Sequence, residues 1–283
     1  MNYRHAFHAG NFADVLKHAV LARILAYLAR KENGYRVIDT HAGVGLYDLA
    51  ADEALRTGEW HDGIGRLRQT RLSAALTDYL APWNDAVRAV NGGDALLLYP
   101  GSPKIATTLG RLQDRYVFNE LHPEDRDALA ALFAGDRRVR VEGLDGYVAV
   151  RAELPPHERR GLTLIDPPFE VAGEFDRMLK AMRDAHKRFA TGVLMLWYPI
   201  KDVAAVDAFL KEARETGVGR LIAIEQWVRD PETTGPLAGA GVLVANAPYR
   251  LAEETAAILP ELTDLLAVGE GAGARVLPLV EGA

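Results

Sequence analysis

The sequence predicts an α/β fold in which helices cover both faces of a mainly parallel, doubly wound sheet. Short apolar runs of strand character alternate with segments that repeat apolar residues at helical spacing. Several of these runs end in an acidic residue, which is typical of strands that lead to a ligand crevice. The chain of 283 residues, 49% hydrophobic and 25% charged, suits one large domain with an insert and excludes intrinsic disorder as its main state.

The composition excludes several classes of function. Cysteine is absent, which excludes disulfides, thiolate metal sites and cysteine nucleophiles. The formal net charge of −6 argues against nonspecific coating of a polyanion, although a local basic patch can still contact RNA or DNA. No apolar run approaches the ~20 residues of a membrane span, and residues 1–5 lack the apolar stretch of a secretory signal. We therefore expect a cytoplasmic protein that does not contact a membrane.

The N-terminal part of the chain combines a long helix, a buried strand and a glycine loop. Asn11 is a good N-cap and Asp14 is placed for a capping box, so a helix is predicted from Asn11 to Gly34. Residues 35–39 form an apolar run that leads into the loop 40–45.

Residues 52–93 contain helical stretches around 64–72 and 74–90 but no convincing strand. We predict that they form a helical insert subdomain, and that residues 1–51 and 94–283 form the main domain.

The rest of the chain alternates between strands and helices. Strands are expected at residues 95–99, 116–120, 139–141, 162–166, 193–197, 221–227 and 241–245. Helices are expected from the N-cap Ser102 with Pro103 behind it, from Pro123, and over residues 174–190, 204–215 and 252–266. We expect the last two strands to form an antiparallel edge and the glycine-rich segment from Gly269 to be weakly ordered.

Acidic residues follow four of the predicted strands. They are Asp39, Glu120, Asp145 and Asp166. Ligands of open α/β sheets bind outside the carboxyl ends of the strands, so these side chains are expected to meet in one crevice. Four acids there could bind a metal ion or a ligand rich in hydroxyl and amino groups, and their spacing does not decide between the two.

The segment Gly43-Val44-Gly45 lets the backbone approach a ligand closely. It lacks the third glycine of the dinucleotide fingerprint, and no Gly-Lys-Ser/Thr follows it, so pyrophosphate binding is poorly supported. A nucleoside without phosphates is the simpler ligand. The alternative is a tight turn between a strand and a helix with no ligand at all.

The tetrapeptide Asp166-Pro167-Pro168-Phe169 carries the most chemical information. Two prolines after a buried strand stiffen the backbone and remove two N–H donors, which leaves the Asp166 carboxylate and the Pro167 carbonyl as acceptors. The ring of Phe169 adds an apolar plate. Two rigid acceptors beside an aromatic ring suit a planar group with an exocyclic NH₂, although a strand that ends in a stiff turn would have the same sequence.

The acid-ended strand, the glycine loop and this tetrapeptide together resemble S-adenosylmethionine-dependent amino methyltransferases of nucleic-acid bases. Further segments resemble the bacterial RlmJ family, which methylates N6 of an adenine in 23S ribosomal RNA. They are residues 3–18 (YRHAFHAGNFADVLKH), 39–43 (DTHAG), 99–103 (YPGSP), 120–123 (ELHP) and 197–200 (WYPI). The resemblance runs from residue 3 to about residue 250 and implies a Rossmann-like class I methyltransferase fold, a mainly parallel seven-stranded sheet with a small helical insert.

The resemblance also implies roles for individual residues. The catalytic residues would be Asp166, Pro167 and Phe169. The residues that bind S-adenosyl-L-methionine would be His18, His41, Gly43, Gly45, Ser102, Glu120, Asp145, Gly146 and Asp166. The substrate-binding residues would be Tyr3, Arg4, His5 and Lys17. The partner would be 23S rRNA, naked or as an early precursor, met by a monomer that needs no metal.

Three features depart from the family pattern or need explanation. Phe169 stands where tyrosine is common, but it keeps a ring for stacking. Residues 246–249 (NAPY) replace a more proline-rich stretch, and their role is open. The separation between Gly45 and Glu120 exceeds the ~20 residues of a dinucleotide fold, and the helical insert accounts for it.

RNA contact requires cations near the crevice. Arg4, His5, His8 and Lys17 cluster near the N-terminus, and a second set is expected to flank strands near the same crevice. The second set comprises Arg137, Arg138, Arg140, Arg159 and Arg160. An ordinary solvated surface is the alternative for each of these residues.

Three other functions stay open at this point. His8, Asp14 and His18 could converge on a metal ion, although no HExxH signature is present. The same chemistry could act on DNA adenine, cytosine N4 or a glutamine amide. A noncatalytic RNA-binding module could keep the fold without the activity.

Overall fold

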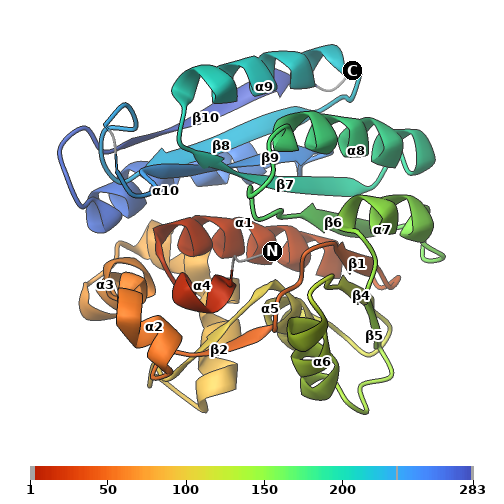
Figure 1. Ribbon diagram of the computed structural model, residues 1–283, viewed down its shortest axis with the longest axis horizontal. Helices are drawn as coiled ribbons and strands as arrows, with labels where there is room; N and C mark the ends of the chain where they lie inside the picture. The colour runs from red at the N-terminus through yellow and green to blue at the C-terminus, as the bar shows by residue number, and fades with distance from the viewer. Residues whose placement is uncertain (1–3, 234, 282–283) are drawn as a thin grey trace.

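The computed structural model describes residues 4–233 and 235–281. Figure 1 shows three layers, with a central sheet between two layers of helices. This confirms the α/β class predicted from the alternation of strands and helices. No helix in the described ranges is long and apolar enough to span a membrane.

The described residues form one eight-stranded sheet in the order β10-β8-β9-β7-β6-β1-β4-β5. Its strands are β1 (Arg36–Asp39), β4 (Arg115–Asn119), β5 (Val139–Glu142), β6 (Gly161–Ile165), β7 (Val193–Ile200), β8 (Leu221–Trp227), β9 (Gly239–Ala245) and β10 (Gly273–Val280). Neighbours from β5 to β7 are parallel, whereas β9 is antiparallel to both β7 and β8. The carboxyl ends of β1, β4, β6 and β7 therefore share one edge of the sheet.

The C-terminal segment corrects two expectations. The segment from Gly269 is not a weakly ordered tail, because β10 pairs antiparallel with β8 and adds an eighth strand to the seven expected. The antiparallel pairing of β8 and β9 is confirmed, but β10 and not β9 forms the edge. Gly271, with φ of 76°, lies in the turn before β10, so glycine here marks a turn and not disorder.

Alternate residues of each strand point into opposite helical layers. Val37 and Leu164 face a core with α1 (Phe12–Ala29), α4 (Ala74–Asn91), α5 (Ser102–Leu109), α6 (Pro123–Leu132) and α10 (Leu251–Leu266). Ile38 and Ile165 face the other core, with α7 (Gly146–Glu153), α8 (Glu174–Arg188) and α9 (Val203–Glu215). Strands buried on both faces explain why the apolar runs of the sequence are continuous.

The segment 52–93 is helical, as expected. It contains α2 (Asp52–Thr57), the short turn η2 (His61–Gly65), α3 (Arg66–Gln69) and α4. Its ends are joined by a two-stranded sheet of β2 (Leu46–Asp48) and β3 (Leu98–Pro100), so the strand expected at 95–99 lies outside the main sheet. Large side chains of α4, among them Trp83, share the core that contains α1. A Cβ atom on Gly63 would lie 2.0 Å from the Gly10 carbonyl oxygen, which shows how closely η2 approaches the N-terminal segment.

Two helix starts differ from the expected capping. The Asn11 side chain accepts the Asp14 N–H at 3.0 Å, which confirms the N-cap, but the Asp14 carboxylate accepts from Gly10 N and not from the N-cap residue. Gly101 and not Ser102 is the N-cap residue of α5. Ser102 then occupies the first helical position, and its hydroxyl is free to act elsewhere.

Candidate active site

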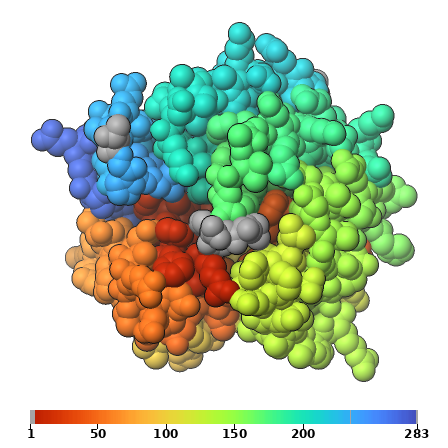
Figure 2. Space-filling view, viewed as in Figure 1, coloured from red at the N-terminus to blue at the C-terminus, as the bar shows by residue number. Residues whose placement is uncertain are grey.

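A cavity of about 920 Å³ opens at the carboxyl edge of the sheet, where the acid-ended strands meet. Figure 2 shows the N-terminal segment in red on this face, between the orange insert and the yellow-green residues that follow β4. Most of the predicted site residues line the cavity. They are His5, Lys17, His18, His41, Gly43, Ser102, Glu120, Asp145, Gly146, Asp166, Pro167 and Phe169.

Two expected site residues lie outside the cavity wall, and the structure does not describe a third. Gly45 is not in the cavity wall, because it packs against α6, where a Cβ would lie 2.9 Å from Leu129. Arg4 is exposed outside the wall and forms an ion pair with Glu124. Tyr3 lies outside the described residues.

Asp166 directly follows β6, at the centre of the carboxyl edge. Its Oδ2 accepts a hydrogen bond from Lys17 Nζ at 2.7 Å. Within the described ranges no donor contacts Oδ1, so this oxygen remains available to a ligand. The two prolines that follow offer no N–H, so Asp166 and the Pro167 carbonyl leave an acceptor-rich corner.

Phe169 forms one wall of this corner. Its φ of 53° lies in the left-handed region, which is strained for a residue with a side chain. The ring packs edge-to-face against Phe175 and Trp197, with centroid distances of 5.2 Å and 6.1 Å. Packing on two sides holds the strained backbone and fixes the plane of the ring beside Asp166.

Lys17 was expected to contact RNA phosphate, but the structure buries it beneath the corner. Its Nζ lies 2.9 Å from Asp14 Oδ1 and 2.7 Å from Asp166 Oδ2. Burial disfavours the charge, but the two carboxylates outweigh burial and raise the pKa of Lys17 well above its usual value. In this structure Lys17 therefore orients Asp166 and is not a surface cation.

The Glu120 carboxylate, held by the glycine loop, is a second acceptor group in the cavity. Glu120 Oε2 accepts from Gly43 N at 2.9 Å, and Oε1 accepts from His122 N at 2.8 Å. Gly43 has a φ of 59°, a conformation that favours glycine. Burial raises the pKa of Glu120, while the two N–H groups oppose that shift. The carboxylate is thus oriented by backbone and faces the cavity.

Ser102 and His41 both converge on buried Asp39. The Ser102 hydroxyl donates to Asp39 Oδ2 at 2.6 Å, and the His41 N–H donates to Oδ1 at 3.2 Å. Burial lowers the pKa of His41 to about 4 and that of His18 to about 3, so both rings are neutral near pH 7. Asp39 does not line the cavity; it positions two residues that do.

Asp39 should impose a distinct pH dependence on stability. Burial raises its pKa from 3.8 to about 7, so the folded protein holds this proton more tightly than the unfolded chain. Its contribution to the free energy of unfolding is full below about pH 4 and is lost as the pH rises through about 7. We expect Asp39→Asn to remove a slope on the order of 1.4 kcal/mol per pH unit from urea unfolding in this window. Parallel curves for the two proteins would contradict this assignment.

Asp145 is the N-cap residue of α7, Gly146 is its first residue, and both line the cavity. Asp145 Oδ1 caps the helix by accepting from Tyr147 N and Val148 N, and Oδ2 accepts from Arg177 Nη2 at 3.1 Å. A Cβ on Gly146 would lie 2.5 Å from the His41 ring. Glycine is therefore the residue that leaves room for His41 at this point.

Several residues of the cavity wall were missed by the sequence reasoning as site residues. They include Tyr47, Tyr147, Glu174, Arg177 and Trp197. The Arg177 guanidinium lies 4.5 Å from the Tyr147 ring centroid, and the Tyr147 hydroxyl donates to Glu174. Only Trp197 carried a signal, since it stands in a segment that supports the family resemblance; Arg177 lies on an ordinary amphipathic helix.

The histidines of the N-terminal segment pair with acids. His5 Nε2 lies 2.9 Å from Asp14 Oδ2, and His8 Nδ1 lies 3.0 Å from Glu59 Oε1. His18 Nδ1 contacts the Tyr99 hydroxyl at 2.8 Å. The metal-binding alternative of His8, Asp14 and His18 therefore lacks its geometry, and the described residues contain no group of three metal-ligating side chains.

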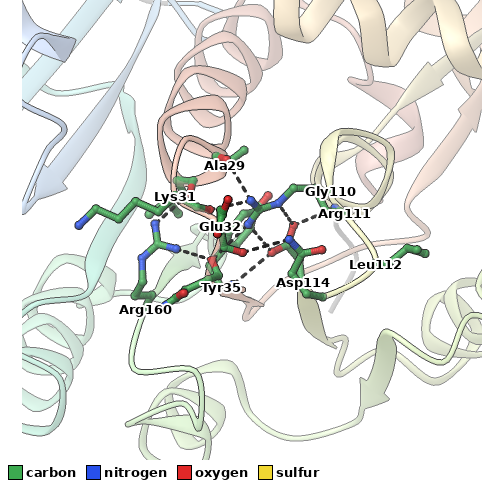
Figure 3. Close-up of polar contacts among 12 residues, drawn as sticks. Ala29, Lys31, Glu32, Tyr35, Gly110, Arg111, Leu112, Asp114 and Arg160 are labelled. Atoms are coloured by element: carbon green, nitrogen blue, oxygen red, sulfur yellow. Dashed lines mark hydrogen bonds and ion pairs between the residues drawn. The ribbon is translucent and has the colours of Figure 1, made fainter.

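The second set of arginines was expected at the crevice, but most of it lies at the opposite edge of the sheet. Arg160 precedes β6, and it donates to the carbonyls of Leu28 and Asn33 at the end of α1. Figure 3 shows Arg160 in this position, with Arg111 and Asp114 close by.

Arg137, Arg138 and Arg159 likewise precede parallel strands, and residues before such strands lie at the amino edge, away from the crevice. Arg138 pairs there with Asp136 at 2.7 Å. Arg140 lies within β5 and forms an ion pair with Glu142 at 3.0 Å and a second one with Glu153. Arg138, Arg140 and Arg160, which were expected to contact phosphate, therefore contact groups of the protein itself.

Comparisons with known proteins agree on one family. The chain matches the family model described as "Ribosomal RNA large subunit methyltransferase D, RlmJ" over residues 32–277. A Haemophilus influenzae protein named "Ribosomal RNA large subunit methyltransferase J" is 43% identical over 275 residues, which cover 96% of each chain. An Escherichia coli protein of that name is 39% identical over 273 residues, again 96% of each. A solved Legionella pneumophila structure has a TM-score of 0.86 at 33% identity and covers 96% of this chain and 98% of that chain.

Proposed function

Because this chain belongs to the RlmJ family of ribosomal RNA large subunit methyltransferases, we propose that it methylates N6 of one adenine in 23S rRNA with S-adenosyl-L-methionine. The observation that carries the chemistry is the corner of Asp166, Pro167 and Phe169, which combines two acceptors with a fixed aromatic ring at the cavity wall. We further propose naked rRNA or an early precursor as the substrate, a monomeric enzyme and a cytoplasmic location.

The donor set of the cavity fits S-adenosyl-L-methionine. Glu120, oriented by two backbone N–H groups, suits the two hydroxyls of a ribose, as acids at strand ends commonly do. Asp145 and Gly146 line the same cavity and are proposed to read the adenine of the cofactor. Neutral His18 and His41 add no positive charge that would repel a sulfonium. When bound, the cofactor supplies an electrophilic methyl group.

The Asp166 corner would hold the target base. An adenine must leave its stack to reach a cavity of this depth, at a cost of a few kcal/mol. Its ring would stack on Phe169, while Asp166 Oδ1 and the Pro167 carbonyl accept the two amino hydrogens. That arrangement directs the nitrogen lone pair away from the acceptors. Most of the rate gain then comes from positioning, and Asp166 takes up the departing proton directly or through water.

A methyl-transfer assay tests the proposal. Purified protein is incubated with labelled S-adenosyl-L-methionine and, in parallel, with transcribed 23S rRNA, assembled large subunits and duplex DNA. We expect label in the naked rRNA, recovered after digestion as N6-methyladenosine at a single position. Label in DNA, in cytosine or in protein would replace the proposed substrate, and no transfer to any substrate would indicate a noncatalytic module.

A further inference from the structure

Helix α3 of the insert begins at the rim of the cavity. Asp62, one turn earlier, lines the cavity, and Arg66 pairs with it at 2.7 Å. Arg66 Nη1 also donates to the Ala267 carbonyl, whose neighbours Leu266 and Val268 are cavity residues. The segment 66–71 (RLRQTR) therefore leads from the cavity rim onto the outer surface of the insert.

The next two arginines of this segment differ from Arg66 in lacking partners. Within the described ranges neither Arg68 nor Arg71 forms a hydrogen bond or an ion pair. Arg71 is exposed, whereas Arg68 is partly buried, and its Nε and Nη2 atoms are buried without an acceptor. Burial lowers the pKa of Arg68; nearby Asp94 opposes that shift and Arg88 adds to it. Arg88 is itself paired with Asp94 at 3.1 Å.

Such a pair of cations suits an anion that the protein itself does not provide. A neighbouring positive charge disfavours a cation that is already partly buried, so an anion that docks on the accessible part of the Arg68 guanidinium and on exposed Arg71 is favoured. A guanidinium binds phosphate oxygens in a fork geometry and keeps its charge at any working pH. An RNA strand whose target nucleotide lies in the cavity must extend out of the cavity on both sides of that nucleotide. Each flanking nucleotide carries a phosphate.

We propose that Arg68 and Arg71 form a docking surface for the phosphate backbone of the RNA that flanks the target nucleotide. The proposal rests on the proposed function, since it takes RNA as the substrate. It gives the helical insert a role in holding the substrate, separate from the chemistry at Asp166.

The test measures how the methylation kinetics of Arg68→Gln, Arg71→Gln and the double variant depend on salt. Each phosphate contact contributes about 0.7–0.9 to the slope of log affinity against log salt, so each single variant should show a slope shallower by that amount and the double variant a slope shallower by twice that amount. A fourfold rise in salt should then weaken each single variant about threefold less than it weakens the wild type. We expect a raised KM for RNA at low salt and an unchanged kcat at saturating RNA.

Arg214→Gln is the matched control, because it removes one exposed arginine from α9, on the other face of the sheet. Cofactor affinity should be unchanged in all variants, and the melting temperature should be unchanged in Arg71→Gln and Arg214→Gln, whose side chains are exposed. If Arg68→Gln does not fold, Arg71→Gln still decides, since its side chain is exposed. Slopes and KM values equal to those of Arg214→Gln would overturn the docking surface. A wild-type protein that transfers no methyl group to rRNA would instead overturn the proposed function.

Discussion

Replacement of Asp166 by asparagine is expected to abolish methyl transfer while the protein stays folded. The substitution keeps the size of the side chain but removes its charge and one of its two acceptor oxygens. Oδ1 is the oxygen proposed to accept an amino hydrogen, so the target nitrogen would lose its orientation and its proton acceptor together. Loss of one preorganised contact of this kind costs about 10²–10³ in kcat, and the loss of two roles should bring the rate to background.

The fold should tolerate this change because Lys17 keeps a second partner. Its Nζ remains 2.9 Å from Asp14 Oδ1, so the buried ammonium is not left uncompensated. The kcat and the melting temperature are measured beside those of Asp184→Asn, which removes one carboxylate from α8 outside the cavity wall. Turnover of Asp166→Asn at the wild-type rate would remove the central role assigned to this carboxylate.

The layered fold could be predicted because local signals in the sequence agree with it. Asn11 starts α1, Pro123 stands in the first turn of α6, and Asp166 ends a strand that is apolar along its length. These signals depend on neighbours in the chain, so they can be read without the tertiary structure.

The features that were wrong or missed depend on contacts between distant segments. Strand β10 is half-exposed along its length, and only its pairing with β8 makes it a strand. Helix α7 is short, and its N-cap residue is Asp145, which was expected to be a ligand-binding acid. Neither strand β10 nor helix α7 has a periodic pattern of residues long enough to be recognised in the sequence.

Among the charged residues, too, some positions follow from the local sequence and others depend on contacts between distant segments. Lys17 and Asp166 are 149 residues apart, so nothing local indicates that the lysine is buried against the carboxylate. The arginines before β5 and β6 were placed at the wrong edge because a count of charges ignores strand direction. By contrast, three of the four acids that were expected to meet, Glu120, Asp145 and Asp166, do line one cavity, since the carboxyl ends of parallel strands share an edge. The fourth, Asp39, is buried behind the cavity wall. The roles of these residues stay predictions until the assays above are made.

Gly146→Ala is the second substitution with a large expected effect, and it should act on the cofactor. The added methyl group would lie 2.5 Å from the His41 ring and 2.9 Å from the Thr40 carbonyl oxygen. The backbone oxygen cannot move aside, so His41 must shift into the space assigned to the cofactor. Overpacking of this kind costs about 1–3 kcal/mol, and if the cofactor site bears that cost the Kd of S-adenosyl-L-methionine rises roughly fivefold to 150-fold.

Titration calorimetry with the cofactor in the absence of RNA measures this effect separately from catalysis. Gly219→Ala is the control, because a Cβ at that position meets nothing within 4 Å and the same methyl group is added. The two variants should also differ from each other: Asp166→Asn loses kcat with a smaller change in cofactor Kd, whereas Gly146→Ala loses cofactor affinity first. Wild-type cofactor affinity in Gly146→Ala would mean that the cofactor lies elsewhere in the cavity, and the roles proposed for Asp145 and His41 would fall with it.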